Sequence, residues 1–193
     1  GVLLIADEVQ TGLGRTGKLW GVEHWDVVPD ILTVAKSLGG GVMPISAVTT
    51  TEEIFQPMMY PNPFMHTTTT GGGALACSAA IAAIHVTLRE RLWEQAAEKG
   101  NYLMPHLQKF VVQYPNIFER VTGKGLLIGL HFKNPETGYK AASGLFKRGV
   151  LVAGTLTSAQ TVRIEPPLVV TTGQLDALVD RLGDTLREIN STL

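Results

Sequence analysis

The sequence has almost no cysteine and almost no net charge, and each shortage excludes a class of protein. Its one cysteine, Cys77, excludes an intramolecular disulfide and a zinc site built from cysteines, which fits a reducing cytoplasm. Lysine and arginine number 16 against 17 aspartate and glutamate residues, so the formal net charge is -1. Because the basic residues are scattered, the sequence predicts no binding to nucleic acid or to anionic membranes.

Long hydrophobic runs are missing as well. No stretch reaches the roughly 18 consecutive apolar residues of a membrane span, and no basic segment precedes an apolar one as in a secretory signal. We therefore expect a cytoplasmic protein without a membrane anchor. The 193 residues are 45% hydrophobic, which is enough for a core in one domain or two small ones. Because the sequence starts directly in an apolar run, we expect it to be the C-terminal part of a longer protein.

The apolar pattern predicts two domains of different kinds. Short runs rich in valine, isoleucine and leucine predict buried parallel strands, and an alanine-rich stretch predicts a tightly packed helix. From about residue 91 an amphipathic pattern predicts a second, α+β domain. The expected elements are strands at 2–6, 31–35 and 45–49 and a helix at 74–88, then strands at 125–132, 150–153 and 161–164 and helices at 92–114, 139–148 and from an N-cap at Thr172 onward.

Two of the apolar runs end in a charged residue, Asp7 in one and Lys36 in the other. Strand ends in an open α/β sheet face the crevice where ligands bind, so a buried carboxylate and a buried amine there can reach one small molecule. Pyridoxal phosphate needs this combination, with Asp7 against its pyridinium nitrogen and Lys36 in a Schiff base with its aldehyde. The alternatives are a turn cap at Asp7 and an ordinary edge lysine at Lys36.

The residues that follow Asp7 form a glycine-rich loop. We expect Glu8, on the other side of the strand, to pair with Arg15 and brace this loop. Residues 12–17 match the G-x-G-x-x-G pattern, but an acidic pair follows the strand and no clear helix follows the loop. We therefore reject a dinucleotide site.

Two further segments indicate anion binding. Threonines at 67–70 precede the helix expected at 74–88, where hydroxyls and free backbone N–H groups could hold a phosphate; the alternative is N-capping by one threonine. Arg163 lies on an apolar strand that stops at Pro166 and Pro167, which suits bidentate binding of a carboxylate. An ion pair with Glu165 is disfavoured, because adjacent strand residues point to opposite faces.

Together these motifs resemble those of the class III aminotransferases, which are pyridoxal-phosphate enzymes of fold type I. The matching segments are residues 7–12, 14–17, 29–30, 35–41, 66–69 and 163–168, and the resemblance runs across essentially the whole sequence. It implies an α/β fold: residues 1–90 are the C-terminal part of a large domain with a mostly parallel sheet, and residues 91–193 are a small α+β domain. Residues 39–45, 62–66 and 150–156 resemble family members that act on diamines.

The resemblance also implies roles for individual residues. Lys36 binds the cofactor covalently, and Asp7 pairs with its pyridine nitrogen. Val9 packs on the cofactor ring, and Gln10 lies near the 3-oxygen of that ring. Thr69 donates a hydrogen bond to the phosphate of a cofactor held mainly by the other subunit of a homodimer, and Arg163 holds the substrate carboxylate. The implied reaction moves an amino group from a primary amine, such as putrescine or a related diamine, to a 2-oxo acid.

Two departures from the family pattern keep alternatives open. Residues 70–74 read Thr-Gly-Gly-Gly-Ala where the family has an aromatic followed by Gly-Gly-Asn-Pro, and the family's N-terminal half, with its phosphate-binding Gly-Thr turn, is not in the sequence. One alternative is another class III enzyme, acting on acetylornithine, ornithine, 4-aminobutyrate or β-alanine. The other is a non-catalytic fragment of such an enzyme.

Overall fold

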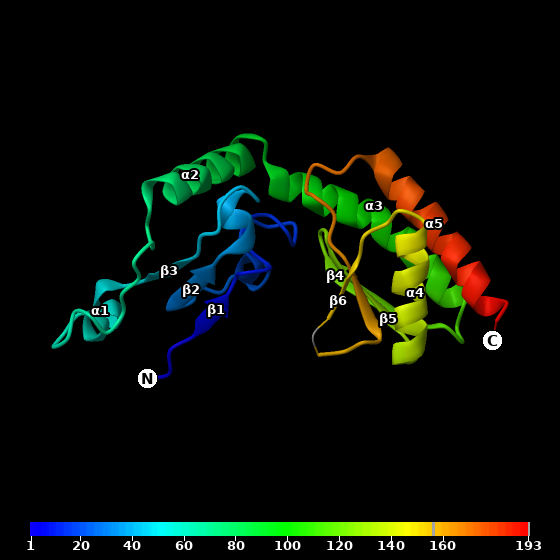
Figure 1. The fold of residues 1–193 in the computed structure, drawn as a ribbon, viewed down its shortest axis with the longest axis horizontal. Helices are drawn as coiled ribbons and strands as arrows, with labels where there is room; N and C mark the ends of the chain where they lie inside the picture. Colours follow the sequence, from blue (N-terminus) through cyan, green and yellow to red (C-terminus); the bar gives the residue numbers. More distant parts are fainter. Residues whose placement is uncertain (156, 193) are drawn as a thin grey trace. The chain divides into compact units, whose positions relative to one another are not determined.

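The computed structural model describes residues 1–155 and 157–192, and it divides into two compact units, Gly1–Trp93 and Glu94–Leu193 (Figure 1). The first unit is built on a three-stranded sheet and the second on a four-stranded sheet. Within the described ranges, no helix combines the length and the apolar character needed to cross a bilayer.

The sheet of the first unit is mixed rather than mostly parallel. Its strands are β1 (Ile5–Asp7), β2 (Ile31–Val34) and β3 (Ala47–Thr50), in that spatial order. β1 and β2 run parallel, whereas β2 and β3 are antiparallel, which corrects the expectation of three parallel strands. A parallel neighbour needs a long crossover, usually a helix. The chain instead turns back after Val34 through a short 3-10 helix and two left-handed glycines, Gly40 and Gly41, so β3 returns antiparallel.

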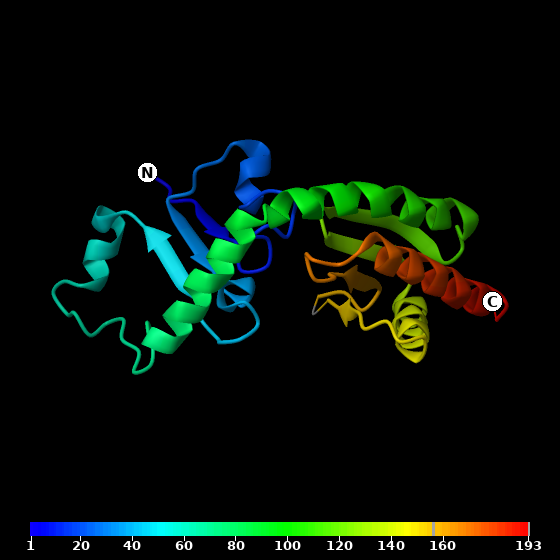
Figure 2. The same ribbon diagram turned by 90° about the horizontal axis from the view of Figure 1, so that it is seen from above.

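Short helices and one long helix complete this unit. They are the 3-10 helices η1 (Gly21–Trp25), η2 (Lys36–Gly39) and η3 (Gln56–Met58) and the α-helices α1 (Glu52–Phe55) and α2 (Ala74–Arg89). Figure 2 shows α2 running across the sheet. A small buried cluster of Leu13, Val34, Leu38 and Ala80 joins the sheet, η2 and α2.

In the first unit the predicted burial of the strands and of α2 is only partly confirmed: Ala6, Val34 and Ala80 are buried, but many other apolar side chains are exposed. Ile5 is 60% exposed, Val48 60% and, on α2, Leu75 70%. An apolar run predicts burial only where a second layer covers it, and within the described residues no such layer lies on these side chains.

The second unit has a larger core. Its elements are α3 (Leu92–Gln113), β4 (Phe118–Lys124), β5 (Leu127–Phe132), α4 (Pro135–Lys147), β6 (Ala153–Gly154), β7 (Thr161–Ile164) and α5 (Thr172–Asn190), and the sheet order is β4-β5-β7-β6 with every pairing antiparallel. The apolar pattern of the sequence did not predict β4, and it placed the N-cap of α5 at Thr172, one residue too late. Thr171 caps α5 by accepting a hydrogen bond from the Gln174 backbone N–H, while the Gln174 side chain accepts one from the Thr171 backbone N–H.

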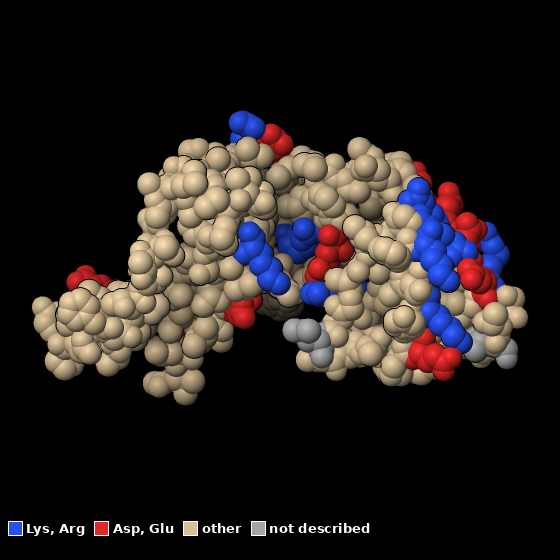
Figure 3. Space-filling model, in the orientation of Figure 1, with Lys and Arg blue, Asp and Glu red and all other residues tan. Residues whose placement is uncertain are grey.

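One face of the four-stranded sheet carries this core. Along β5 the buried residues Ile128, Leu130 and Phe132 alternate with Gly129 and His131, as the two-residue repeat of a strand requires. Side chains of α3, α4 and α5 cover the buried face, among them Leu103, Leu107, Leu145, Leu182 and Leu186. On the face shown in Figure 3, charges of both signs lie over α4 and α5. Two ion pairs of these helices are Lys140–Glu136, at 2.8 Å, and Arg148–Glu188, at 2.7 Å.

His131 lies on the opposite face of the sheet and links the strands on either side of β5. Its Nε2 is 2.8 Å from the hydroxyl oxygen of Thr122 on β4, and its Nδ1 is 3.2 Å from that of Thr161 on β7. Burial, followed by the charge of Arg120, lowers the pKa of His131 below its ordinary value of 6.5, while the charge of Glu119 acts in the opposite direction. The fold therefore favours the neutral imidazole.

Part of the loss of stability at mildly acidic pH should come from His131. Because its pKa is lower in the folded state, the unfolded chain binds more protons as the pH falls through about 6.5, and stability present above that pH is lost. A His131→Gln variant should show a smaller drop in Tm between about pH 7 and 5 than the unmodified protein in calorimetry. His85→Gln, an exposed histidine change on α2, should show the full drop; equal drops in all three proteins would contradict the assignment.

Candidate functional site

Asp7 and Lys36 emerge at the same edge of the first sheet. β1 and β2 are parallel neighbours, with Asp7 in register with Thr33, and Lys36 follows three residues after Thr33. The Asp7 Oδ1 accepts hydrogen bonds from the Val9 backbone N–H at 3.1 Å and from the Thr33 hydroxyl at 3.3 Å. These two bonds hold the carboxylate at the end of its strand, and both Asp7 and Lys36 are exposed rather than buried as expected.

Lys36 has a left-handed backbone, which is unusual for a residue with a side chain. Its φ is +49°, between the extended Ala35 and the rest of η2, and Gly40 and Gly41 follow with φ of +63° and +75°. A non-glycine residue in this region costs roughly 1–2 kcal/mol, and such strain concentrates at functional sites. The fold thus keeps a lysine where glycine would fit the backbone better.

This strain gives a stability prediction. The free energy of unfolding of Lys36→Gly should be about 1 kcal/mol larger than that of Lys36→Ala, because glycine adopts a positive φ without the clash of a Cβ. In urea, Lys36→Gly should therefore unfold at the higher concentration. The reverse order would show that the backbone at this position is not left-handed in solution.

Glu8 is the buried charge of this region, with a relative exposure of 2%. Its Oε2 accepts hydrogen bonds from the Gly21 backbone N–H at 2.9 Å and from the Thr11 hydroxyl, and its Oε1 accepts one from the Val22 backbone N–H at 2.8 Å. Glu8 therefore braces the glycine-rich loop as expected, through η1 and Thr11, while its pairing with Arg15 stays a prediction.

The other predicted residues of this unit lie on loops. Val9, half-buried, and Gln10, exposed, follow Asp7 in the turn after β1. Thr69 is exposed in the segment that leads to α2, as are its three threonine neighbours. The N-cap of α2 is Gly73 and receives no side-chain hydrogen bond, so N-capping by a threonine is wrong, while the phosphate contact of Thr69 stays a prediction.

Arg163 belongs to the second unit, on β7, and it makes the ion pair that the pattern disfavoured. Its Nη1 is 3.3 Å from Oε1 of Glu165, and its Nε donates to the carbonyl oxygen of Gly154 at 3.2 Å. Residues 163 and 165 are two positions apart, not adjacent, so their side chains share one side of the strand. The expectation confused adjacent with alternate positions.

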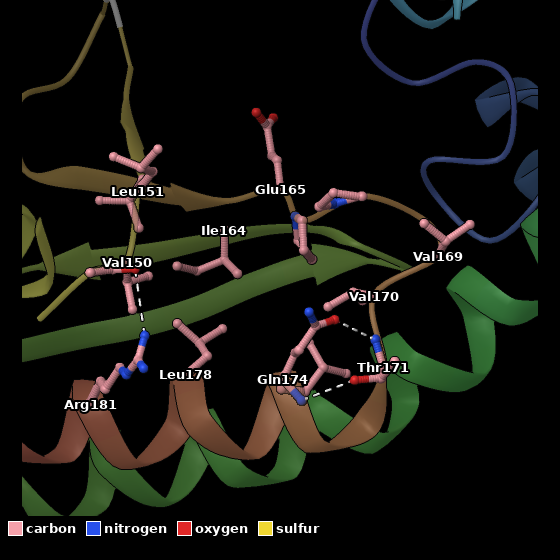
Figure 4. Close-up of a pocket in the computed structure, with 15 residues that line it drawn as sticks. Val150, Leu151, Ile164, Glu165, Val169, Val170, Thr171, Gln174, Leu178 and Arg181 are labelled. Atoms are coloured by element: carbon pink, nitrogen blue, oxygen red, sulfur yellow. Dashed lines mark hydrogen bonds between the residues drawn. The ribbon is translucent and has the colours of Figure 1, made fainter. Parts of the chain in front are cut away.

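In the second unit a cavity of about 620 Å³ lies between α5 and residues of the segments 149–152 and 164–171 (Figure 4). Its lining is mainly apolar, with Val150, Leu151, Ile164, Val170 and Leu178 among the residues. In Figure 4 the side chain of Glu165 points away from α5. Among the described residues, no cluster of histidine, cysteine and carboxylate side chains is arranged to hold a metal ion.

Two hydrogen-bond partners of the predicted residues were not predicted from the sequence. Thr33 supports Asp7 from the neighbouring strand, and a polar residue within the otherwise apolar run of β2 was the available signal. The carbonyl group of Gly154 supports Arg163 through the pairing of β6 with β7. Because every residue has a backbone carbonyl group, the sequence does not indicate which of them accepts this hydrogen bond.

Known proteins resemble this chain along nearly its whole length. The family model "Aminotransferase class-III" matches residues 1–186. A putrescine aminotransferase of Pectobacterium atrosepticum is 49% identical over 193 residues, which are 100% of this chain and 41% of that protein.

Solved structures share the fold. An ornithine aminotransferase from Toxoplasma gondii ME49 superposes with a TM-score of 0.89 at 31% identity, covering 100% of this chain and 45% of the other. An acetylornithine aminotransferase from Elizabethkingia anophelis gives 0.86 at 38% identity, covering 97% and 48%. The chain thus spans less than half the length of these relatives. The family match along the chain, together with a carboxylate and a lysine at neighbouring strand ends, shows that the chain belongs to the class III aminotransferases, whose cofactor is pyridoxal phosphate.

Proposed function

We propose that the protein moves an amino group from a primary amine, with a diamine such as putrescine as donor, to a 2-oxo acid. The observation that supports this most strongly is the position of Asp7 and Lys36 at the same ends of two parallel neighbouring strands. The relative at 49% identity is a putrescine aminotransferase, which favours a diamine as the donor.

The residues at this edge fit pyridoxal phosphate. When bound, the cofactor supplies an aldehyde that condenses with amines and a ring that accepts electrons. The Asp7 carboxylate is preoriented by Val9 and Thr33, so it can accept a hydrogen bond from a protonated ring nitrogen without reorganising. The exposed Lys36 amine can hold the aldehyde carbon covalently and, once displaced by a substrate amine, carry a proton to and from the substrate carbon.

The remaining assignments belong to the same proposal. Val9 packs on the cofactor ring, Gln10 lies near its 3-oxygen, and Arg163 holds the carboxylate of the 2-oxo acid through its guanidinium. Thr69 holds the phosphate of a cofactor bound mainly by a second copy of the chain. Activity then depends on a homodimer.

A panel of amine donors tests the choice of substrate. With 2-oxoglutarate as acceptor, kcat/KM should be highest for putrescine and lower for ornithine, acetylornithine, 4-aminobutyrate and β-alanine. The ornithine and acetylornithine aminotransferases that share the fold make the amino-acid donors the second candidate. Strong turnover of these amino acids with weak turnover of diamines would overturn the diamine assignment.

A further inference from the structure

The cavity of the second unit has an apolar floor and an open apolar wall. Ile164, Val170 and Leu178 are buried and belong to the core of this unit. Leu151 and Val169, which also line the cavity, are 83% and 62% exposed. The volume of about 620 Å³ lies within the range of about 300–1,000 Å³ that is typical of small-molecule sites. Apolar side chains left open around such a hollow indicate that an apolar ligand covers them.

A cation of α5 lies at one end of this apolar surface. Arg181 lines the cavity about one helical turn after Leu178. Its Nη1 is 3.5 Å from the Gly149 carbonyl oxygen, at the limit of a hydrogen bond, and no carboxylate of the described residues forms an ion pair with it. The guanidinium therefore keeps donors for an anion, and a carboxylate is the partner that matches its paired N–H groups.

The other charged side chain of the lining does not cancel this cation. Glu165 lines the cavity, but Figure 4 shows its side chain pointing away from α5, the helix that carries Arg181. Its Oε1 is 3.3 Å from Nη1 of Arg163, so its charge is already partly compensated. At the far end of the cavity, the side chains of Thr171 and Gln174 each bond the backbone N–H of the other residue. Of the described lining residues, Arg181 is therefore the unpaired charge.

The length of the lining sets the size of the ligand. The part of α5 that lines the cavity runs from its N-cap, Thr171, to Arg181, and ten residues of helix rise about 15 Å. We propose that the cavity binds amphipathic carboxylates such as medium-chain fatty acids, with the chain along Val170 and Leu178 and the head on Arg181. The inference does not depend on the proposed function, because Arg163 does not line the cavity and Asp7 and Lys36 belong to the first unit.

Calorimetric titration of the holoenzyme with saturated fatty acids tests the apolar part of the proposal. The dissociation constant should fall about three- to fourfold for each methylene added from butyrate to octanoate, because each one buries further apolar surface. Octyltrimethylammonium has a similar chain and a quaternary nitrogen that cannot condense with the cofactor. It should bind at least about tenfold more weakly than octanoate, because Arg181 repels its charge. A dissociation constant independent of chain length, or equal binding of the cation, would overturn the proposal.

Single substitutions locate the site. Arg181→Gln should weaken octanoate binding about tenfold or more, because it removes the cation that holds the head. Arg187→Gln is the matched control: this arginine of α5 pairs with Asp184 and lies outside the cavity, so octanoate binding should stay within about twofold. Val169→Glu places a like charge on the exposed wall and should also weaken binding. If Arg181→Gln binds octanoate as tightly as the unmodified enzyme does, the proposal fails.

A fatty acid can also pair with the carboxylate clamp proposed at Arg163, and one variant separates the two sites. Arg163→Gln should weaken the binding of glutarate, an unreactive dicarboxylate, and leave that of octanoate unchanged. If octanoate binding falls in Arg163→Gln but not in Arg181→Gln, the cavity is not the site, and this inference alone is overturned. If glutarate binds Arg163→Gln as tightly as the unmodified enzyme, the proposed clamp fails, while the cavity assignment still stands or falls with Arg181→Gln.

Discussion

Replacing Lys36 with alanine should reduce transamination by more than about 10³-fold, because the change removes both the amine that holds the cofactor and the group that moves the proton. Lys36 is the residue that the fold presents, exposed and with a left-handed backbone, at the strand edge next to Asp7. The measurement is the single-turnover rate with putrescine, monitored through the visible absorption of the cofactor.

Lys36→Arg is the matched control for this change. Arginine keeps the positive charge and the long side chain, but its guanidinium is not deprotonated in proteins and so does not serve as a nucleophile or base. It should be as inactive as the alanine variant while unfolding at a similar temperature. Activity of either variant within tenfold of the unmodified enzyme would show that another lysine carries the chemistry.

Replacing Glu8 with alanine should destabilise the protein by about 3 kcal/mol or more, with a matching fall in the midpoint of urea unfolding. The Glu8 carboxylate accepts bonds from two backbone N–H groups of η1 and from the Thr11 hydroxyl, and Gly21 is itself buried. Its removal leaves the buried Gly21 N–H and the half-buried Val22 N–H and Thr11 hydroxyl without this acceptor. Each buried unpaired donor costs about 1–3 kcal/mol.

Two further variants show whether the effect belongs to those hydrogen bonds. Glu8→Gln keeps one acceptor oxygen and should lose about half as much stability as the alanine variant. Glu53→Ala removes an exposed carboxylate from the first turn of α1 and should change stability by no more than about 0.5 kcal/mol. A Glu8→Ala protein as stable as the Glu53→Ala protein would contradict the bracing role.

The candidate site residues could be singled out from the sequence because charge at the end of an apolar run is a local signal. Asp7 and Lys36 stand out in this way, and their parallel strands bring them to one edge. The antiparallel return of β3 was missed, because the apolar pattern of a strand does not record its direction. The predicted burial of Ile5 and Leu75 was wrong for a related reason, since burial depends on which other elements cover a surface.

The partners of the site residues were harder to predict than the residues themselves. Thr33 contacts Asp7, and the Gly154 carbonyl contacts Arg163, each across a pair of strands. The register of such a pair cannot be predicted from the sequence of one strand alone. The Arg163–Glu165 pair, in contrast, joins a residue of β7 to the residue just after that strand, and it follows from the two-residue repeat of an extended chain. It was open to prediction from the sequence, and only a wrong count of positions excluded it.

The central claim is that Lys36 binds pyridoxal phosphate covalently, and one measurement tests it most directly. The holoenzyme is reduced with borohydride, which makes the bond between lysine and cofactor permanent, then digested and analysed by mass spectrometry. We predict that the mass of one reduced cofactor lies on the peptide that contains Lys36. Finding that mass on a different lysine, or on none while the enzyme still transaminates, would contradict the account.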